Sequence, residues 1–343
     1  MKEILSQVVA GKDLSREEAR RSMELIMSGS ASETQIGSLL TALRMKGETS
    51  EEITGFAETM RRYTVKIKCD GQDVIDTCGT GGDRKGTFNI STAVAFVVAG
   101  AGVPVAKHGN HGISSSCGSA DVLKSLGVRL DLPPQTVAKT LARIGMGFLY
   151  APAFHPAMKY AGKPRRELGF RTSFNLLGPL TNPVGAAYQL MGVYDRSLTA
   201  KLAEVLLSLG VRRAMVVHGL DGMDEISTAA PTQVSEVVDG AVKSYILDPT
   251  EYGFPSCSAD DYRGGTPDEN AEIIERVLQG KRDRRRDIVL INAAAALSVA
   301  GKAEGLREGL ALAAASIDSG AALAKLEALR EFSQHYRGTA LCS

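Results

Sequence analysis

The stretch from residue 74 to residue 128 constrains the fold of this chain more than any other part of the sequence. Two short apolar runs, at residues 74–77 and 103–106, each predict a buried strand. Between them lie the glycine-rich turn GTGGD at residues 79–83 and the polar block NIST at residues 89–92, which opens an apolar helix. A strand, a helix and a second strand within about thirty residues is the length of a βαβ unit. The sequence therefore predicts two parallel strands in one sheet.

Small polar residues follow both predicted strands. The first strand runs into the glycine-rich turn, and the second runs into KHGN at residues 107–110 and a serine cluster at residues 114–116. Because the carboxyl ends of parallel strands meet at one edge of a sheet, these segments are expected to lie together. Backbone amides in glycine-rich turns and at helix N-termini bind phosphate. The pattern predicts a site for an anionic, phosphate-bearing ligand.

Each of these segments also has a purely structural interpretation. The turn at residues 79–83 is compatible with an ordinary connection, and residues 89–92 with ordinary capping of the helix. A dinucleotide-binding fold is disfavoured, because the spacing is not G-x-G-x-x-G and no acidic residue for a ribose follows about twenty residues later. Lys107 stands near that point, at a strand exit without an evident structural partner, so we favour its contact with a ligand. His108 and His111 are compatible with hydrogen-bonding loop residues.

Composition limits the class of protein. The chain has 343 residues, of which 44% are hydrophobic and 23% charged, as expected for a globular protein of two domains or one large domain. The net charge of +1 argues against a nucleic-acid partner that is bound by bulk charge. Five scattered cysteines without a C-x-x-C pair indicate neither a zinc site nor a disulfide framework. No signal-peptide pattern and no apolar run of membrane-spanning length is found, so we expect a cytoplasmic protein without membrane contact.

The first 65 or so residues predict helices only. Capping-box patterns, S/T-x-x-E/Q, occur at residues 15–18, 32–35 and 49–52. Apolar residues between positions 36 and 43 recur with the period of one helix face. A small helical domain follows from these patterns. Its apolar faces are compatible with a dimer interface, although packing within the domain is the favoured interpretation.

Strands and helices alternate from residue 73 to the end of the sequence. This alternation predicts an α/β domain with a largely parallel sheet. Two short strands near residues 234–238 and 242–247 suggest a hairpin that turns at Asp239 and Gly240. Two prolines within residues 174–183 predict a shaped loop in that segment.

Three charged segments carry alternative interpretations. Asp224 and Glu225 follow a predicted strand and resemble a magnesium site that shares its ligands with substrate phosphates, but a solvated acidic turn explains them equally well. Arg165 and Arg166 form an ordinary surface pair, or one of them binds a carboxylate through two hydrogen bonds. The basic run at residues 281–286 contains Asp283 and lies between two predicted helices, so a solvated loop is favoured over a nucleic-acid patch.

Seven short motifs then occur in order along the whole chain. They are GTGGD (79–83), NIST (89–92), KHGN (107–110), SADVL (119–123), HPAM (155–158), NLLGPLTNP (175–183) and DGMDEIS (221–227). With these motifs the chain resembles the anthranilate phosphoribosyltransferase family. The resemblance implies a small N-terminal α-helical domain, residues 1–70, that forms a homodimer, with part of residues 155–185 packing nearby. It also implies a larger α/β domain, residues 71–343, with a largely parallel central sheet of the nucleoside phosphorylase/phosphoribosyltransferase type.

The resemblance further implies an activity. Family members transfer the 5-phosphoribosyl group of phosphoribosyl pyrophosphate (PRPP) to the amine of anthranilate and release pyrophosphate, which is the second step of tryptophan synthesis from chorismate. The active site is expected between the two domains. The implied cofactor is Mg²⁺, with two ions per active site that are held partly by the pyrophosphate.

Site residues are carried over position by position. The implied contacts with PRPP are Gly79, Gly82, Asp83, Thr87, Asn89, Ile90, Ser91, Thr92, Lys107, His108, Gly109, Asn110, Ser114, Ser115 and Ser119. The implied contacts with anthranilate are Gly79, Asn110 and Arg165, and the implied metal ligands are Ser91, Asp224 and Glu225. Lys107 and the metal are expected to stabilise the leaving pyrophosphate. Whether His108 or His155 takes the proton of the amine stays open.

One position departs from the family pattern, and two other functions compete with this one. His111 stands where family members commonly have arginine after KHGN, so substrate affinity is expected to differ.

A pyrimidine nucleoside phosphorylase shares the fold group, but the GTGGD and DGMDEIS motifs and the context of Arg165 favour the transferase. A non-catalytic, nucleic-acid-binding paralogue is disfavoured because it should lose Asp224 and Glu225 and carry a strong basic excess.

Overall fold

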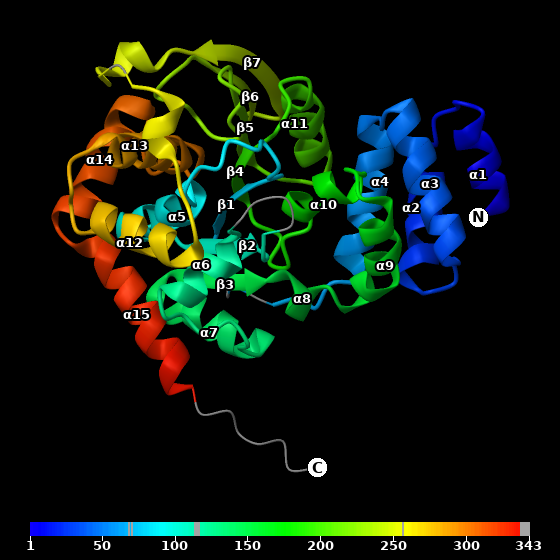
Figure 1. Ribbon diagram of the computed structural model, residues 1–343, viewed down its shortest axis with the longest axis horizontal. Coiled ribbons are helices and arrows are strands. Elements are labelled where there is room, and N and C mark those ends of the chain that lie inside the picture. The colour runs from blue at the N-terminus through cyan, green and yellow to red at the C-terminus, as the bar shows by residue number, and fades with distance from the viewer. Residues whose placement is uncertain (68, 70, 113–116, 256, 337–343) are drawn as a thin grey trace.

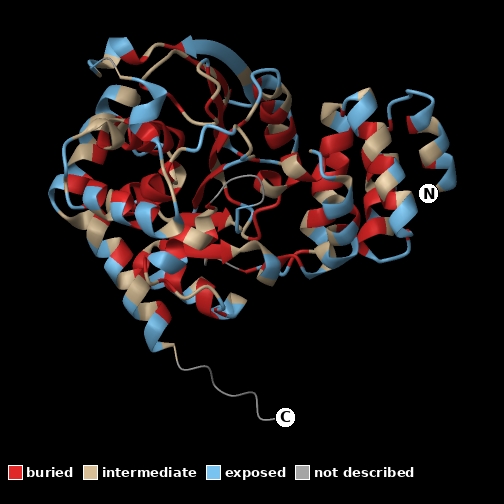
Figure 2. Ribbon diagram, in the orientation of Figure 1, coloured by how far each residue is buried: buried red, intermediate tan, exposed pale blue. Residues whose placement is uncertain are grey.

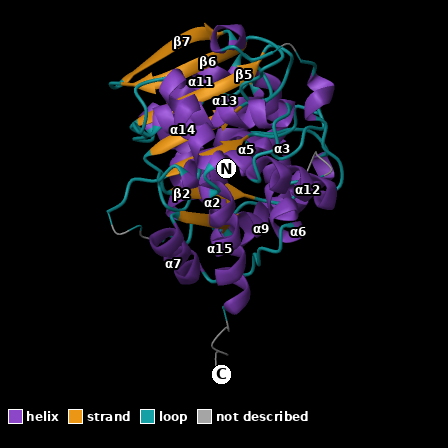
Figure 3. Ribbon diagram, turned by 90° about the vertical axis from the view of Figure 1, so that its left-hand side faces the viewer, coloured by secondary structure: helices purple, strands orange, loops and turns teal. Residues whose placement is uncertain are grey.

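A computed structural model describes residues 1–67, 69, 71–112, 117–255 and 257–336. One seven-stranded sheet crosses the middle of the molecule, and helices cover both of its faces (Figures 1 and 3). The strands are β1 (Ile75–Gly79), β2 (Val105–Gly109), β3 (Met146–Tyr150), β4 (Tyr188–Gly192), β5 (Arg213–Gly219), β6 (Thr232–Val238) and β7 (Ala241–Leu247). The α/β class that the sequence predicted is confirmed.

The strand order is β3-β2-β1-β4-β5-β6-β7. The first five strands in this order are parallel, and β6 runs antiparallel to both of its neighbours, β5 and β7. Ile75 pairs with Val105, so the predicted βαβ unit is confirmed. Asp239 and Gly240 both have positive φ, at 52° and 73°, which is the backbone of the predicted two-residue hairpin turn. The order reverses between β1 and β4, and ligands of open α/β sheets bind at such a switch point.

The second strand of the βαβ unit lies further along the chain than predicted. The sequence placed it at residues 103–106, but β2 starts at Val105 and contains Lys107 and His108. Pro104 has no N–H and cannot donate to the ladder, and its carbonyl oxygen accepts a hydrogen bond from the amide of Ile75 at 3.0 Å. Regular pairing therefore begins one residue later, and both polar side chains belong to a buried strand.

Helices from the second half of the chain cover one face of the sheet, as the buried residues in Figure 2 show. α5 (Ile90–Gly100) is apolar all round and lies between the sheet and three C-terminal helices, α13 (Arg284–Val299), α14 (Leu306–Asp318) and α15 (Ala321–His335). Further helices of the α/β part of the chain are α6 (Ser119–Ser125), α7 (Pro134–Ile144), α8 (Ala151–Phe154), α11 (Leu198–Ser208) and α12 (Pro267–Leu278). Among the described residues, no single helix is long and apolar enough to cross a membrane, and α14 and α15 qualify only as a pair that is bent by 58°.

The N-terminal helices form a bundle at one end of the molecule (Figure 1). They are α1 (Lys2–Val9), α2 (Arg16–Met27), α3 (Glu33–Lys46) and α4 (Ser50–Arg62). All three predicted capping boxes are present, at Ser15, Ser32 and Thr49. α9 (Lys159–Leu168) lies against this bundle, where Lys163 pairs with Glu33 at 2.6 Å. The bundle and one face of the sheet share a continuous apolar core.

Two segments that were predicted as loops are helical. Residues 174–183 contain α10 (Phe174–Leu180); Pro179 lies inside it without an N–H to donate, and the helix ends one residue later. The basic run at residues 281–286 enters α13, whose first turn is capped by the side chain of Asp283. Arg286 is buried and pairs with Asp318 at 2.7 Å, so this part of the run is a packed helix start and not a solvated loop. The predicted helix at HPAM begins later, since residues 156–158 form a 3₁₀ turn before α9.

Glu52 anchors the helical bundle from inside. Its carboxylate is fully buried and accepts hydrogen bonds from the amides of Leu14 and Thr49, both at 2.8 Å, and from Lys46 at 3.0 Å. We expect Glu52→Ala to lower the free energy of unfolding by about 3 kcal/mol, because it leaves two amides and part of an ammonium group unsatisfied. Urea denaturation checks this value. The exposed neighbour Glu51→Ala should cost less than about 0.5 kcal/mol, and equal losses in both variants would contradict this role.

Candidate active site

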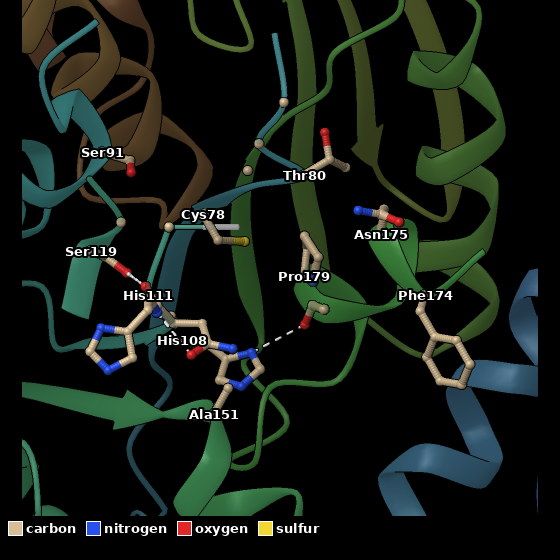
Figure 4. A pocket seen from close by; sticks show the side chains of 18 of the residues that line it. Cys78, Thr80, Ser91, His108, His111, Ser119, Ala151, Phe174, Asn175 and Pro179 are labelled. Carbon is tan, nitrogen blue, oxygen red and sulfur yellow. Dashed lines mark hydrogen bonds between the residues drawn. The ribbon is translucent and has the colours of Figure 1, made fainter. Parts of the chain in front are cut away.

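A cavity of about 880 Å³ opens at the carboxyl ends of β1 and β2 and extends to α9 and α10. Figure 4 shows Ser91 and Ser119 on one wall, Phe174 and Asn175 on the facing wall, and His108 between them. Every predicted site residue that the structure describes lines this cavity: Gly79, Gly82, Asp83, Thr87, Asn89, Ile90, Ser91, Thr92, Lys107, His108, Gly109, Asn110, Ser119, Arg165, Asp224 and Glu225. Ser114 and Ser115 lie outside the described residues. The roles of these residues stay predictions.

Glycines at the ends of two strands allow the segment after β5 to lie close to the switch point of the sheet. A Cβ at Gly192, at the end of β4, would overlap the carbonyl oxygen of Asp224. A Cβ at Gly79, at the end of β1, would lie 3.2 Å from the Asp224 carboxylate. A side chain at either position would push the acidic pair away from the glycine-rich turn. The amide of Asp224 also donates to the Asp83 carboxylate at 3.4 Å, so three distant segments meet here.

The carboxylates that meet at this point repel one another. Burial and the charge of Asp83 raise the pKa of Asp224 to about 7. Burial, and then the charge of Asp224, raises the pKa of Glu225 as well, while Lys107 and the Ser91 amide oppose that shift. Burial and mutual repulsion therefore make it costly for these carboxyl groups to be ionised together. A divalent cation would remove this repulsion.

Lys107 is buried and already has partners within the protein. Its ammonium group donates to the carbonyl oxygen of Thr77 and, at 3.1 Å, to the hydroxyl of Ser91. Burial lowers the pKa of Lys107, and the charges of Asp76 and Glu225 oppose that shift. The interpretation that this lysine lacks a structural partner was wrong, because the strand extends past it. Lys107 nevertheless lines the cavity, between the helix start and the acidic pair.

The start of α5 faces the same cavity. Asn89 occupies the N-cap position, but its side chain makes no capping bond; its amide nitrogen donates to the Cys117 carbonyl oxygen at 3.2 Å, and its oxygen accepts from Asn270 at 3.1 Å. The interpretation of Asn89 as an ordinary capping side chain is therefore wrong. The hydroxyl of Thr92 is buried without a hydrogen-bond partner in the part of the chain that the structure describes. An unpaired buried donor at a helix start suits an anionic ligand.

Two buried histidines belong to a directional chain of hydrogen bonds. His108 Nδ1 lies 3.1 Å from the carbonyl oxygen of Gly178, which can only accept, so this nitrogen carries the proton. His108 Nε2 then accepts from Nε2 of His155 at 3.2 Å, which leaves a lone pair on His155 Nδ1 at 3.1 Å from the Thr64 hydroxyl. That hydroxyl also lies 2.9 Å from the carbonyl oxygen of Met60, and its single proton serves one of these two acceptors. Burial lowers the pKa of His108 to about 3 and that of His155 to about 4. Both rings are neutral at pH 7, and the lone pair of His108 is engaged by His155, so His108 is not a base in this state.

Arg165 presents an unpaired guanidinium group to the cavity. It lies on α9 with its Cζ atom 5.0 Å from the centre of the Phe174 ring, and burial lowers its pKa. Within the described ranges no carboxylate or carbonyl oxygen accepts a hydrogen bond from it. A half-buried guanidinium fork beside an aromatic ring suits a planar carboxylate ligand. By contrast, its exposed neighbour Arg166 lies at the rim.

His111 is held by a carboxylate of the next helix. Its Nδ1 lies 2.5 Å from Asp121, and its ring meets the edge of Tyr150 at 5.4 Å between ring centres. The second carboxylate oxygen of Asp121 accepts from the amides of Gly112 and Gly118. His111 therefore has a structural partner at the cavity, and the effect of histidine at this position on affinity stays a prediction.

The oxygen-rich acidic corner fits Mg²⁺. Asp224, Glu225 and the Ser91 hydroxyl are hard oxygen donors, and like-charge repulsion there favours a cation. In the described part of the chain, no group of three or more histidine, cysteine, aspartate or glutamate side chains is arranged to hold an ion by itself. Mg²⁺ commonly uses one or two carboxylates together with substrate phosphates, which is the arrangement that these residues permit.

Comparison with known proteins agrees with this geometry. The model of the glycosyl transferase family helical bundle domain matches residues 2–64, and that of the a/b domain matches residues 71–323. An anthranilate phosphoribosyltransferase of Moorella thermoacetica is 56% identical over 96% of this chain and 97% of the relative. The enzyme of that name from Symbiobacterium thermophilum is 55% identical over 98% of this chain and 99% of the relative. The chain belongs to the anthranilate phosphoribosyltransferase family.

Solved structures of the anthranilate phosphoribosyltransferase family share the whole fold. The structure from Thermus thermophilus has a TM-score of 0.91 and 41% identity, and the comparison covers 96% of this chain and 99% of that one. The Saccharomyces cerevisiae structure in complex with PRPP and Mg has a TM-score of 0.89 and 29% identity, with 97% of each chain covered. These likenesses confirm the fold class that the motifs implied. They support the transferase interpretation over the two alternative functions.

The structure adds cavity residues that the sequence did not single out. Asn175 lines the cavity from α10 and accepts the amide of Thr172 at 2.9 Å. Lys159 and Lys163 of α9 also line it. Asn175 opens the NLLGPLTNP motif, so a signal existed, but the segment was interpreted only as a shaped loop. The two lysines follow HPAM at helical spacing, and only the packing of α9 shows that they face the cavity.

The two neutral histidines predict a loss of stability in mild acid. Their pKa values are lower in the folded chain than the usual value near 6.5, so their contribution is present above about pH 6.5 and is lost as the pH falls toward 4 and then 3. Between pH 7 and pH 5 we expect a loss of about 2 kcal/mol for each histidine. His155→Gln should lose correspondingly less between these pH values in urea denaturation. An equal loss in the wild type and this variant would contradict the assignment.

Proposed function

We propose that the protein transfers the 5-phosphoribosyl group of PRPP to the amine of anthranilate and releases pyrophosphate. One observation carries this proposal: a single cavity joins a glycine-rich turn, a helix start and an acidic corner on one side to an unpaired guanidinium group, that of Arg165, on the other. The first side suits a diphosphate ester with Mg²⁺, and the second suits an aromatic carboxylate. Names of relatives with 50% identity or more support the same activity.

The donor is proposed to bind across the switch point of the sheet. The turn that contains Gly79, Gly82 and Asp83 would place backbone amides against the pyrophosphate. The N-terminal turn of α5, with Ser91 and Thr92, would bind further phosphate oxygens. Ser91, Asp224 and Glu225 would hold Mg²⁺, two ions per site in this proposal, and the ions would neutralise charge on the leaving pyrophosphate.

The chain's own groups would act mainly through position and charge. Lys107 is fixed by two hydrogen bonds near the expected leaving group, so no reorganisation is needed as negative charge develops there. The amine of anthranilate is already neutral at pH 7, so a strong base is not required. This agrees with His108, which is neutral and whose lone pair is engaged by His155. Arg165 would orient the acceptor through its carboxylate.

We propose that this protein has the two domains and the homodimeric assembly that the family resemblance implies. Residues 1–70 form a helical domain that makes a homodimer, and residues 71–343 form the α/β domain that binds PRPP. We also propose that the protein acts in the cytoplasm. Analytical ultracentrifugation of the whole chain tests the homodimer, and a species of monomer mass at micromolar concentration would contradict it.

A fluorescence assay tests the activity directly. Anthranilate is fluorescent, and its signal should fall only when PRPP and Mg²⁺ are both present. Omission of either component and addition of EDTA are the controls. Loss of signal without PRPP, or phosphate-dependent cleavage of a pyrimidine nucleoside in its place, would assign the protein to another activity.

A further inference from the structure

Arg171 lies against the glycine-rich turn at Gly82. It lies in the connection between α9 and α10, and its side chain is half-buried. Gly82 has a φ of 84°, and a Cβ at this glycine would lie 2.8 Å from Nη2 and 3.1 Å from Cζ of Arg171. The guanidinium group therefore occupies the space that any side chain at Gly82 would need.

The same guanidinium group stacks on an aromatic ring. The Cζ atom of Arg171 lies 4.1 Å from the centre of the Tyr194 ring, which is close for a cation over an aromatic face. Tyr194 follows β4 and also holds the turn, since its amide donates to the hydroxyl of Thr80 at 3.2 Å. The amide of Thr80 in turn donates to the carbonyl oxygen of Gly192 at 2.9 Å. Two consecutive contacts thus connect the turn to the end of β4.

Ordinary ion pairing does not account for Arg171. Over residues 1–67, 69, 71–112, 117–255 and 257–336, no acceptor is hydrogen-bonded to its five N–H donors and no carboxylate pairs with it. The other arginine that stacks on a ring in this region, Arg165, faces the cavity. Arg171 does not line the cavity, so its contact with the turn, and not direct contact with a ligand, is what the structure shows.

We propose that Arg171 is a positioning residue for the PRPP site: stacked on Tyr194, it holds Gly82 in the positive-φ conformation that presents the amides of the glycine-rich turn to the pyrophosphate. This proposal rests on the proposed function. The cavity wall that contains Phe174 and Asn175, here called the acceptor wall, begins shortly after Arg171 in the chain. The amide of Thr172 donates to Asn175, so one short segment contacts the donor turn and orders the acceptor wall.

Steady-state kinetics of four variants and one control variant tests the proposal. Arg171→Met keeps the length of the side chain, and Arg171→Lys keeps the charge, but neither keeps the planar stack. Both should raise the KM for PRPP by about 3- to 30-fold, the range of a cation–π contact, with kcat and the KM for anthranilate within about twofold. Tyr194→Leu should have the same effect and Tyr194→Phe almost none. Arg143→Met, an exposed arginine on α7, is the matched control.

A double variant separates positioning from direct binding. If Arg171 acts only while stacked on Tyr194, Arg171→Met with Tyr194→Leu should raise the KM for PRPP no more than either change alone. Additive effects, a nearly wild-type Arg171→Lys, or a KM for PRPP that none of the changes moves would each overturn the proposal. Calorimetric titration of inorganic pyrophosphate with Mg²⁺ gives the same comparison without catalysis. A wild-type chain that consumes no anthranilate would instead reject the proposed function.

Discussion

Asp224→Asn combined with Glu225→Gln should abolish the response to magnesium and lower kcat/KM at least about 1,000-fold. The expected loss corresponds to several kcal/mol of transition-state stabilisation, which is typical of a metal ion that neutralises a leaving group. Both replacements keep the shape of the side chain and remove its charge. Initial rates over a magnesium titration at saturating PRPP measure the effect.

The same variant should be more stable than the wild type. Burial and like charge raise the pKa of both carboxyl groups, to about 7 for Asp224, so the folded chain loses stability as the pH rises above about 4, the usual pKa of a carboxyl group. The gain in melting temperature should therefore be larger at pH 8 than at pH 5. Glu327→Gln with Glu331→Gln removes two exposed carboxylates of α15 and should change neither property. A variant of Asp224 and Glu225 that keeps the wild-type metal response would place the metal site elsewhere.

Arg165→Ala should raise the KM for anthranilate by about 10- to 100-fold and leave the KM for PRPP nearly unchanged. A charge-assisted hydrogen bond to a carboxylate contributes about 1.5–3 kcal/mol, and the guanidinium group lies where burial would strengthen it. Arg165→Lys should be intermediate, because lysine keeps the charge but loses the fork. Arg166→Ala tests whether a neighbouring positive charge suffices.

An acceptor without the carboxylate makes this prediction sharper. The wild type should discriminate strongly between anthranilate and aniline, and Arg165→Ala should treat the two amines almost alike. This comparison isolates the interaction between one side chain and one group of the substrate. A KM for anthranilate that Arg165→Ala does not move would remove Arg165 from the acceptor site.

Local patterns in the sequence predicted most of the fold. The βαβ unit, the three capping boxes and the hairpin at Asp239 each depend on residues within a few positions of one another, and all are confirmed. The two errors in which a helical segment was predicted as a loop have a common cause. Residues 174–183 and 281–286 were judged by their prolines and charges, but α10 packs against the bundle and Arg286 pairs with Asp318. Such tertiary contacts outweigh local preference.

The site was predicted in outline because strand ends meet at one sheet edge. The motifs supplied the residues, and parallel topology implied that the turn after β1 and KHGN would come together. The sequence did not show that Asp83 lies against Asp224, or that Lys107 is satisfied by Thr77 and Ser91. The first fact depends on the close approach of the segment after β5 to Gly192, and the second on the extension of β2 past Lys107.

The chain of hydrogen bonds from Thr64 to Gly178 also limits how this sequence can vary. Its direction is fixed by the carbonyl oxygen of Gly178, so His108 must donate through Nδ1 and accept from His155 through Nε2. A replacement at one histidine survives only if the new side chain keeps both functions, or if the other members change with it. The four positions come from four separate segments, and we expect them to vary together as one inherited unit. Attempts to reshape the acceptor wall will therefore succeed more often when Thr64, His108 and His155 are varied in combination.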